Sequence, residues 1–200
     1  DTLDADVLVI AGDLCPYVTP ETLDKFFSTI SIPVIYIPGN HEYYGSSTHD
    51  TYGHSNVFMP INNIVEIDGV VFAGSTYWSS PTKYAIKQIN DYYKIRDFDI
   101  WKLHREDVKF LKSVFSADVI VTHFAPSYRS CAPVYLGSDL NSYFMNDGEY
   151  LVGVHDEKLW IHGHNHNSSS YELNGVDIIA NPKGYYSENR NYNPSLIVEI

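Results

Sequence analysis

The sequence has little positive charge and few cysteines. Its 200 residues include 13 Lys and Arg against 25 Asp and Glu, a formal net charge of −12. Because nucleic-acid polymers are bound through clustered basic side chains, a long DNA or RNA partner is disfavoured. Cys15 and Cys131 are too few for a disulfide framework and indicate free thiols in a reducing cytoplasm. No run of about 18 apolar residues is present, so we expect no membrane span.

The segment "LWIHGHNHNSS" is unusually rich in imidazoles. His162, His164 and His166 occupy alternate positions in it. A single His is more often a surface or hydrogen-bonded residue than a ligand, and a metal site needs about four donors. A metal-binding interpretation therefore depends on donors from elsewhere in the chain.

Four short apolar runs predict buried strands of a sheet. They are "VLVIAG" (7–12), "VIYIPG" (34–39), "ADVIVTHF" (117–124) and "KLWIHGH" (158–164). Between the first two, "TPETLDKFFSTI" predicts a helix with Thr19 as N-cap and Pro20 at the first helical position. Thr22 stands where a capping box has Glu or Gln, so we expect no reciprocal cap. Strand, helix and strand in this order predict a parallel crossover.

The rest of the chain mixes turn signals with helical periodicity. Asp-Gly and Asn-Gly pairs between β-rich runs are typical of hairpins. We expect hairpins at Asp68-Gly69 and Asn174-Gly175, helices within 84–116 (broken near "RDFD") and near 139–152, and a last strand in "PSLIVEI" (194–200).

Each of the four predicted buried strands runs directly into polar donors. The donors are Asp13, Asn40 with His41, His123, and His164 with His166. In open α/β sheets, ligands gather at the carboxyl edges of the strands. Packing alone gives no reason for four strands to deliver Asp, Asn and His to one edge.

These pieces, "GD", "GNHE", "TH" and "GHNH", resemble in order and spacing the motifs of the calcineurin-like metallophosphoesterases. "IIANPKGY" and "THFAPSYRS" resemble a bacterial and phage-type branch of that family. The resemblance implies an α/β fold, with two mixed β-sheets packed face to face and helices outside, and one domain over 1–200. It also implies two divalent metal ions, with Mn favoured and Fe, Zn or Ni as alternatives.

The resemblance assigns the metal ligands position by position. Asp13 corresponds to the carboxylate that bridges the two ions. Asn40, His123 and His164 correspond to the other ligands of one ion, and His166 helps to hold the second. Imidazole and amide oxygen suit ions such as Mn, Fe or Zn.

The resemblance also assigns the catalytic residues. A hydroxide activated by both ions attacks phosphorus, so Asp13 is catalytic as well as a ligand. His41 is the outer-sphere acid that protonates the leaving oxygen, and Glu42 orients it. His162 has no ligand role and is expected to be structural.

One family motif is missing from the printed sequence. The family normally has an upstream Asp-x-His strand, whereas Asp4-Ala5-Asp6 is the nearest match before Asp13. We expect this strand to lie upstream of the printed residues. The alternatives are a strand supplied by a partner chain, or a degenerate protein with one intact metal site.

The predicted function is a cytoplasmic hydrolase of phosphomonoesters or phosphodiesters, acting on a small phosphorylated substrate. The alternative is a catalytically weak binding or scaffold protein of the same fold, and the oligomeric state stays open. Candidate substrate contacts are Arg129, Tyr43 and His54, with His49 as a further loop candidate. Asn90-Asp91 is interpreted, from position alone, as the start of a lid over the site.

Overall fold

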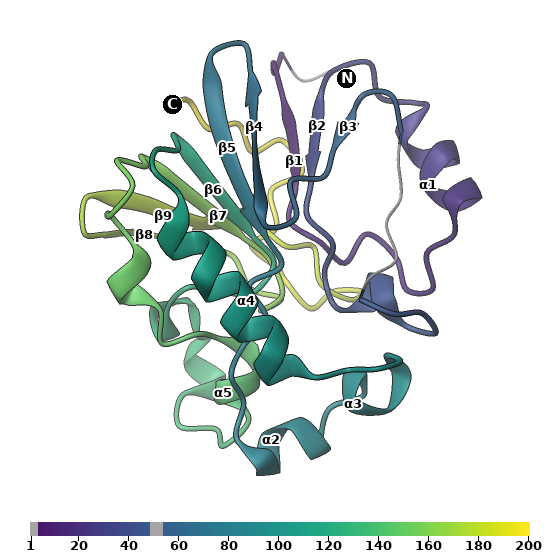
Figure 1. The fold of residues 1–200 in the computed structure, drawn as a ribbon, viewed down its shortest axis with the longest axis vertical. Helices are drawn as coiled ribbons and strands as arrows, with labels where there is room; N and C mark the ends of the chain where they lie inside the picture. The colour runs from purple at the N-terminus through teal and green to yellow at the C-terminus, as the bar shows by residue number, and fades with distance from the viewer. Residues whose placement is uncertain (1–3, 49–53) are drawn as a thin grey trace.

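Two β-sheets of different size form the centre of the molecule (Figure 1). The computed structural model describes residues 4–48 and 54–200. The small sheet has the order β1-β2-β3 and is parallel, and the large sheet has the order β4-β5-β6-β7-β9-β8 and is mixed. The strands are β1 (Leu8–Ile10), β2 (Val34–Tyr36), β3 (Val57–Phe58), β4 (Asn63–Ile67), β5 (Val70–Ser75), β6 (Val119–Thr122), β7 (Leu159–His162), β8 (Ser169–Leu173) and β9 (Val176–Ala180).

The first crossover follows the predicted strand, helix and strand. α1 (Pro20–Phe27) connects β1 to β2, which pair in parallel. Thr19 caps α1, but the expectation of no reciprocal cap was wrong. The Thr22 hydroxyl accepts from the Thr19 N–H at 3.0 Å, and the Thr19 hydroxyl accepts from the Thr22 N–H at 3.3 Å. A hydroxyl has the acceptor capacity that the motif usually takes from Glu or Gln.

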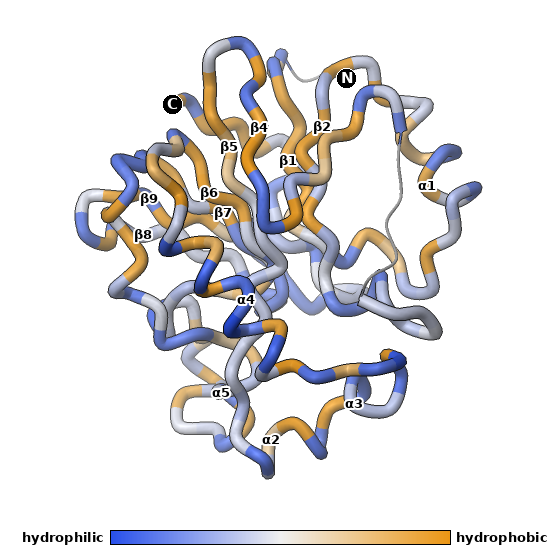
Figure 2. The backbone as a smooth tube through the Cα atoms, in the orientation of Figure 1, coloured by the Kyte–Doolittle hydropathy of each residue, from blue (hydrophilic) through white to orange (hydrophobic). Residues whose placement is uncertain are grey.

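Apolar side chains fill three layers and give the predicted fold of two stacked sheets with outer helices. The inter-sheet layer contains Ile35, Phe72 and Val121, among others. α1 covers the outer face of the small sheet, and α4 (Ile100–Ser113) covers that of the large sheet (Figure 1). Much of β1, β2, β5 and β6 accordingly has the hydrophobic colours of Figure 2.

Both predicted hairpins are confirmed. β4 and β5 join through Asp68 (φ 51°) and Gly69 (φ 85°), and β8 and β9 join through Asn174 (φ 52°) and Gly175 (φ 83°). Positive φ at both turn residues matches the twist of the flanking strands.

Three short helices form a unit at the carboxyl ends of the strands, which we call the helical cap. They are α2 (Lys83–Lys87), α3 (Asp91–Lys94) and α5 (Asn141–Phe144). α2 contacts both of the others, and the three lie together below the sheets in Figure 1. The predicted helix near 139–152 is thus two pieces, because only α5 and a later 3-10 turn form there. The 3-10 turns of the chain are η1 (His41–Tyr43), η2 (Tyr128–Ser130), η3 (Pro133–Tyr135) and η4 (Glu149–Leu151).

The strand predicted in 194–200 was wrong. These residues pair with no strand of the described chain, and their apolar side chains are exposed. A short apolar run forms a strand only where a neighbouring strand offers its hydrogen-bonding edge. Within 4–48 and 54–200, no helix has the length and apolar character that a membrane span requires.

Candidate metal centre

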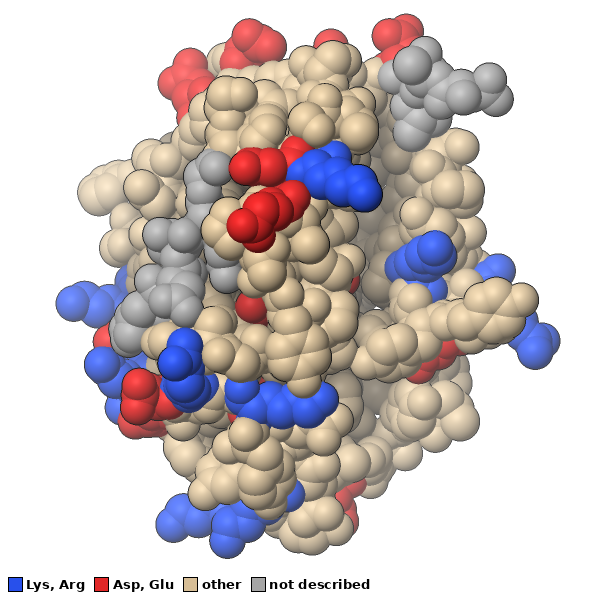
Figure 3. All heavy atoms as spheres, turned by 90° about the vertical axis from the view of Figure 1, so that its right-hand side faces the viewer, with Lys and Arg blue, Asp and Glu red and all other residues tan. Residues whose placement is uncertain are grey.

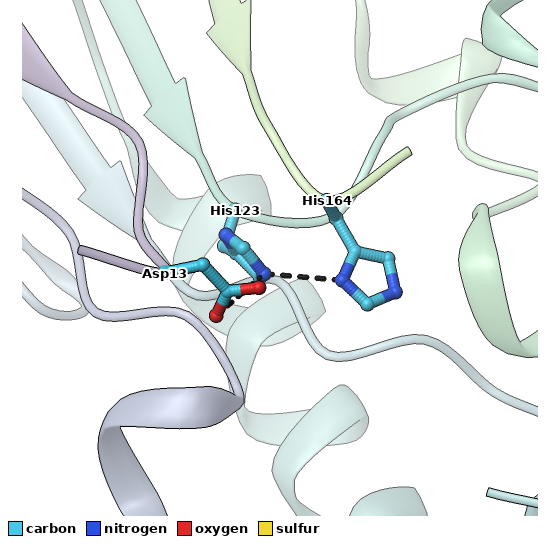
Figure 4. A group of neighbouring side chains, drawn as sticks. All are labelled: Asp13, His123 and His164. Carbon is cyan, nitrogen blue, oxygen red and sulfur yellow. Dashed lines mark hydrogen bonds and ion pairs between the residues drawn. The ribbon is translucent and has the colours of Figure 1, made fainter. Parts of the chain in front are cut away.

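Four strand ends deliver donor atoms to one point. Asp13 follows β1, Asn40 follows β2, His123 follows β6 and His164 follows β7. The His123 Nε2 atom lies 3.0 Å from Asn40 Oδ1, 3.1 Å from His164 Nδ1 and 3.5 Å from Asp13 Oδ1. Figure 4 shows Asp13, His123 and His164 pointing toward one another. We call these four residues the ligand cluster.

The spacing of the ligand cluster fits the donors of a single ion. Ion–nitrogen bonds of about 2.0–2.1 Å put neighbouring donors about 3.0 Å apart at right angles and about 3.4 Å apart in a tetrahedron. One donor atom each from Asp13, His123 and His164 lies within 4.8 Å of the others. Carboxylate, amide oxygen and imidazole together suit a borderline divalent cation.

The tautomer of His123 and the neutral state of His164 also favour metal binding. The Nδ1 atom of His123 lies 2.7 Å from the Ala11 carbonyl oxygen. A carbonyl only accepts, so Nδ1 carries the proton there and Nε2 can present its lone pair to the cluster when the ring is neutral. Complete burial lowers the pKa of His164 well below its usual range, which keeps that ring neutral.

Asp13 and His123 attract each other electrostatically. Burial is the largest single influence and disfavours the charged form of each, but their attraction, their mutual hydrogen bond and the neighbouring groups together outweigh it. The pKa of the Asp13 carboxyl is therefore held below its usual range, and the pKa of His123 is raised. The site therefore favours a positive charge beside Asp13, which a bound cation supplies as well as a proton does.

The backbone around the ligand cluster packs tightly against the donor side chains. A side chain at Gly12 or Gly39 would collide with His123, and at Gly39 also with Asp13. Asp13, His164 and His166 have φ values of 58°, 63° and 51°, in the left-handed region that such residues seldom adopt. Strain of this kind collects at functional sites.

Glu42 holds the loops under the cluster together. Its buried carboxylate accepts from the backbone N–H groups of Asp13 at 2.9 Å, Leu14 at 2.6 Å and Gly39 at 2.6 Å. The expectation that Glu42 orients the His41 ring therefore differs from the contacts seen. Glu42 instead fixes the loop after β1 against the loop after β2.

His41 and His166 border the cluster without joining its compact group. The His41 ring stacks on Tyr44 with centroids 4.6 Å apart, and its backbone N–H donates to Asp13 Oδ1 at 3.0 Å. His166 Nδ1 lies 2.8 Å from Glu188 Oε2, a carboxylate that the sequence motifs gave no reason to select. This contact leaves Nε2 of His166 as the atom able to bind a metal, and its role as a ligand stays a prediction.

Asp91 is a further residue that the motifs did not identify. It is fully buried at the start of α3, and its Oδ1 accepts from Asn40 Nδ2 at 3.1 Å and from the Tyr44 hydroxyl at 2.8 Å. Tyr143 of α5 donates to the other carboxylate oxygen. Asp91 thereby turns the oxygen of the Asn40 amide toward His123. Asp91 therefore supports the Asn40 side chain as well as belonging to the helical cap, and the interpretation of Asn90-Asp91 as the start of a lid stays a prediction.

The three predicted substrate contacts lie elsewhere. Arg129 pairs with Glu149 at 3.2 Å, Tyr43 packs among apolar residues with 3% exposure, and His54 Nδ1 lies 2.6 Å from Asn56 Oδ1. None of them lines the cavity beside the cluster. His49 lies outside the described residues.

His162 occupies the structural position expected for it. Its Nε2 lies 2.8 Å from the Ser130 hydroxyl, away from the ligand cluster. Burial lowers the pKa of His162 to about 4, so the ring is neutral at pH 7.

A cavity of about 450 Å³ opens next to the cluster. Asp13, Asn40, His41, His164 and His166 line one end, and residues of the helical cap and of the loop 131–138 line the rest. The size is typical of a small-molecule site.

One family model matches most of the chain, one known protein is similar in sequence, and one solved structure is similar in fold. The sequence model described as "Calcineurin-like phosphoesterase" matches residues 1–168. The uncharacterised protein L509 of Acanthamoeba polyphaga mimivirus is 30% identical over 245 residues, covering 100% of this chain and 86% of the relative. The phosphopantetheinyl hydrolase PptH of Mycobacterium tuberculosis has a similar fold, with a TM-score of 0.67 and 15% identity over 91% of this chain and 80% of that one.

Proposed function

The chain belongs to the calcineurin-like phosphoesterase family, and from that premise we propose that it hydrolyses a phosphomonoester or phosphodiester bond of a small substrate with the help of two divalent cations. The single observation that carries the proposal is the convergence of Asp13, Asn40, His123 and His164 at one sheet edge, with donor spacings that suit an ion.

The residues fit the cations that the family implies. The four cluster residues would hold one ion, and Asp13 with His166 would contribute to the second. Manganese is the favoured ion because the donor set mixes hard oxygens with imidazole. When bound, such ions supply Lewis acidity, polarise phosphoryl oxygens and lower the pKa of water.

His41 supplies the proton in this proposal. Its ring borders the cavity at the cluster, and stacking on Tyr44 restricts its orientation. A protonated imidazole there can stabilise the leaving oxygen and transfer its Nδ1 or Nε2 proton to it. The hydrogen bond from its backbone N–H to Asp13 Oδ1 holds His41 beside the ligand cluster.

A small substrate is supported by the charge distribution. On the face drawn in Figure 3, Lys and Arg side chains are scattered among Asp and Glu and form no continuous basic patch. Together with the net charge of −12, this favours a small phosphorylated molecule over a nucleic-acid polymer.

The test compares turnover with metal content. Protein purified with Mn should hydrolyse p-nitrophenyl phosphate or bis(p-nitrophenyl) phosphate, and a strong chelator should abolish the reaction. His41→Ala should lose turnover while elemental analysis finds its metal unchanged. Full activity in the presence of chelator, or in His41→Ala, would contradict the proposal.

A second candidate is a binding protein that holds one ion. It is favoured because, among the described residues, the compact donor group contains Asp13, His123 and His164 but not His166. This candidate predicts that the protein retains about one ion and turns over neither substrate, whereas the enzyme holds two and turns over at least one.

A further inference from the structure

The cavity beside the ligand cluster has two chemically different ends. One end consists of the cluster with His41 and His166. The other consists of the helical cap and the loop 131–138, with a half-buried apolar surface at Ile89, Leu140 and Phe144. The two ends are continuous, because the Phe144 ring stacks on His164 with centroids 5.3 Å apart. A molecule with its phosphate at the cluster therefore has its organic part against the apolar wall.

Apart from the imidazoles, the charged side chains that line the cavity are all carboxylates. Among residues 4–48 and 54–200, no Lys or Arg lines it, whereas Asp13, Asp91 and Glu188 do. Arg129, the cation expected to grip substrate, is engaged by Glu149 away from the cavity. These carboxylates lie at the cluster end, so a second anionic group on the organic part would instead be placed against the apolar wall, where it would lose hydration and meet no cationic side chain of the described residues.

The wall is also able to exclude water. The helical cap is anchored by a buried group of apolar side chains that includes Ile86, Ile95 and Phe124. Tyr143 belongs to this apolar group and also lines the cavity. Buried anchoring of short helices makes the wall a preformed surface, and a preformed apolar surface gains affinity from each methylene that it removes from water.

We propose that this cavity binds phosphoesters whose organic group is uncharged and largely apolar, so that the phosphate at the ligand cluster is the one anionic part of the substrate. This inference rests on the proposed phosphoesterase function, since it assigns the phosphate to the metal end.

Binding of alkylphosphonates tests the substrate class without turnover. With Mn present, calorimetric titration should show the Kd falling about threefold to fourfold per methylene from methylphosphonate to pentylphosphonate. 5-Carboxypentylphosphonate should bind at least about tenfold more weakly than hexylphosphonate, because its terminal carboxylate enters a cavity that offers it no cationic side chain. A Kd that does not depend on chain length, or equal binding of the last two ligands, would overturn the inference.

A variant of the apolar wall and a matched control test which side chains cause the dependence of Kd on chain length. Leu140→Asn should reduce the dependence of Kd on chain length, and Ile89→Asn carries the same test if the first variant fails to fold. Leu136→Asn alters an exposed leucine that does not line the cavity, and it should keep the wild-type dependence. A loss of the dependence in Leu136→Asn as large as that in Leu140→Asn would contradict the assignment of the wall.

Hydrolysis of the matching alkyl phosphates separates this inference from the function it rests on. If every alkyl phosphate is turned over at the same kcat/KM, the enzyme is confirmed and the inference fails. If the phosphonates bind with the expected dependence on chain length but no phosphate ester is cleaved, the proposed function fails and the ligand class stands.

Discussion

The ligand cluster and the helical cap differ in how their side chains are held. In the cluster, polar side chains are fixed by the ends of four buried strands and by hydrogen bonds to the backbone, as His123 is by Ala11. In the cap, three short helices are held mainly by apolar packing around Trp78, Ile86 and Phe124. Metal chemistry needs fixed donors, whereas selection among organic groups needs a shaped surface. The two requirements are met by separate parts of the chain, and changes in one part should have different effects from changes in the other.

The largest effect should come from Asp13→Ala, which breaks the cluster and leaves the cap untouched. Loss of the carboxylate next to His123 removes the negative charge that favours a cation there. We expect kcat/KM to fall about 10⁴-fold or more, because the contribution of the ions to the reaction is lost. Steady-state kinetics with Mn measure this, and activity within tenfold of wild type would refute the role of Asp13.

His41→Ala should come next, because it removes the proposed proton donor but none of the proposed ligands. A fall of about 10²–10⁴-fold in kcat is expected. His54→Ala, a histidine that does not line the cavity, is the control and should retain wild-type kcat. Similar losses in both variants would show that the assay reports folding and not acid catalysis.

Asp91 joins the two regions, since it belongs to α3 of the cap and orients Asn40 of the cluster. Asp91→Leu should weaken Mn binding about 10–100-fold, as loss of a partner to a metal ligand typically does. Asp91→Asn retains an acceptor oxygen and should recover part of that affinity. Mn titration decides this prediction: equal affinity in wild type and Asp91→Leu would show that Asn40 needs no support from the cap.

The last prediction concerns stability and not function, and it leaves both regions intact. Burial raises the pKa of Asp107 on α4 to about 7. The folded state thus favours the protonated carboxyl, and the associated stability is present below about pH 4 and is lost as pH rises through 7, by at most about 1.4 kcal/mol per pH unit. Asp107→Asn stays neutral, so its free energy of unfolding should fall less between pH 5 and 8. Denaturant titrations at both pH values test this, and an unchanged slope would contradict it.

The cluster could be predicted from the sequence because its residues follow strongly apolar strands. Asp13, Asn40, His123 and His164 each come shortly after one of these strands, and parallel strands bring such positions to one edge. Hairpins were predictable for a similar local reason, since Asn-Gly and Asp-Gly specify their own turns.

The residues around the cluster could not be predicted in the same way. Asp91 and Glu188 act through contacts with residues 51 and 22 positions away, and no local pattern specifies those contacts. Arg129 was selected by closeness in sequence to His123, yet its loop turns the side chain to Glu149. The apolar residues of 194–200 likewise lack, within the described chain, the pairing edge that a strand needs.

Metal content tests the central claim most directly. Elemental analysis of wild-type protein and of His123→Ala, both purified with Mn and without chelator, should find about two ions per chain in the wild type and a clear loss in the variant. Equal metal content in the two proteins, or no metal in the wild type, would contradict the assignment of the ligand cluster as a metal centre.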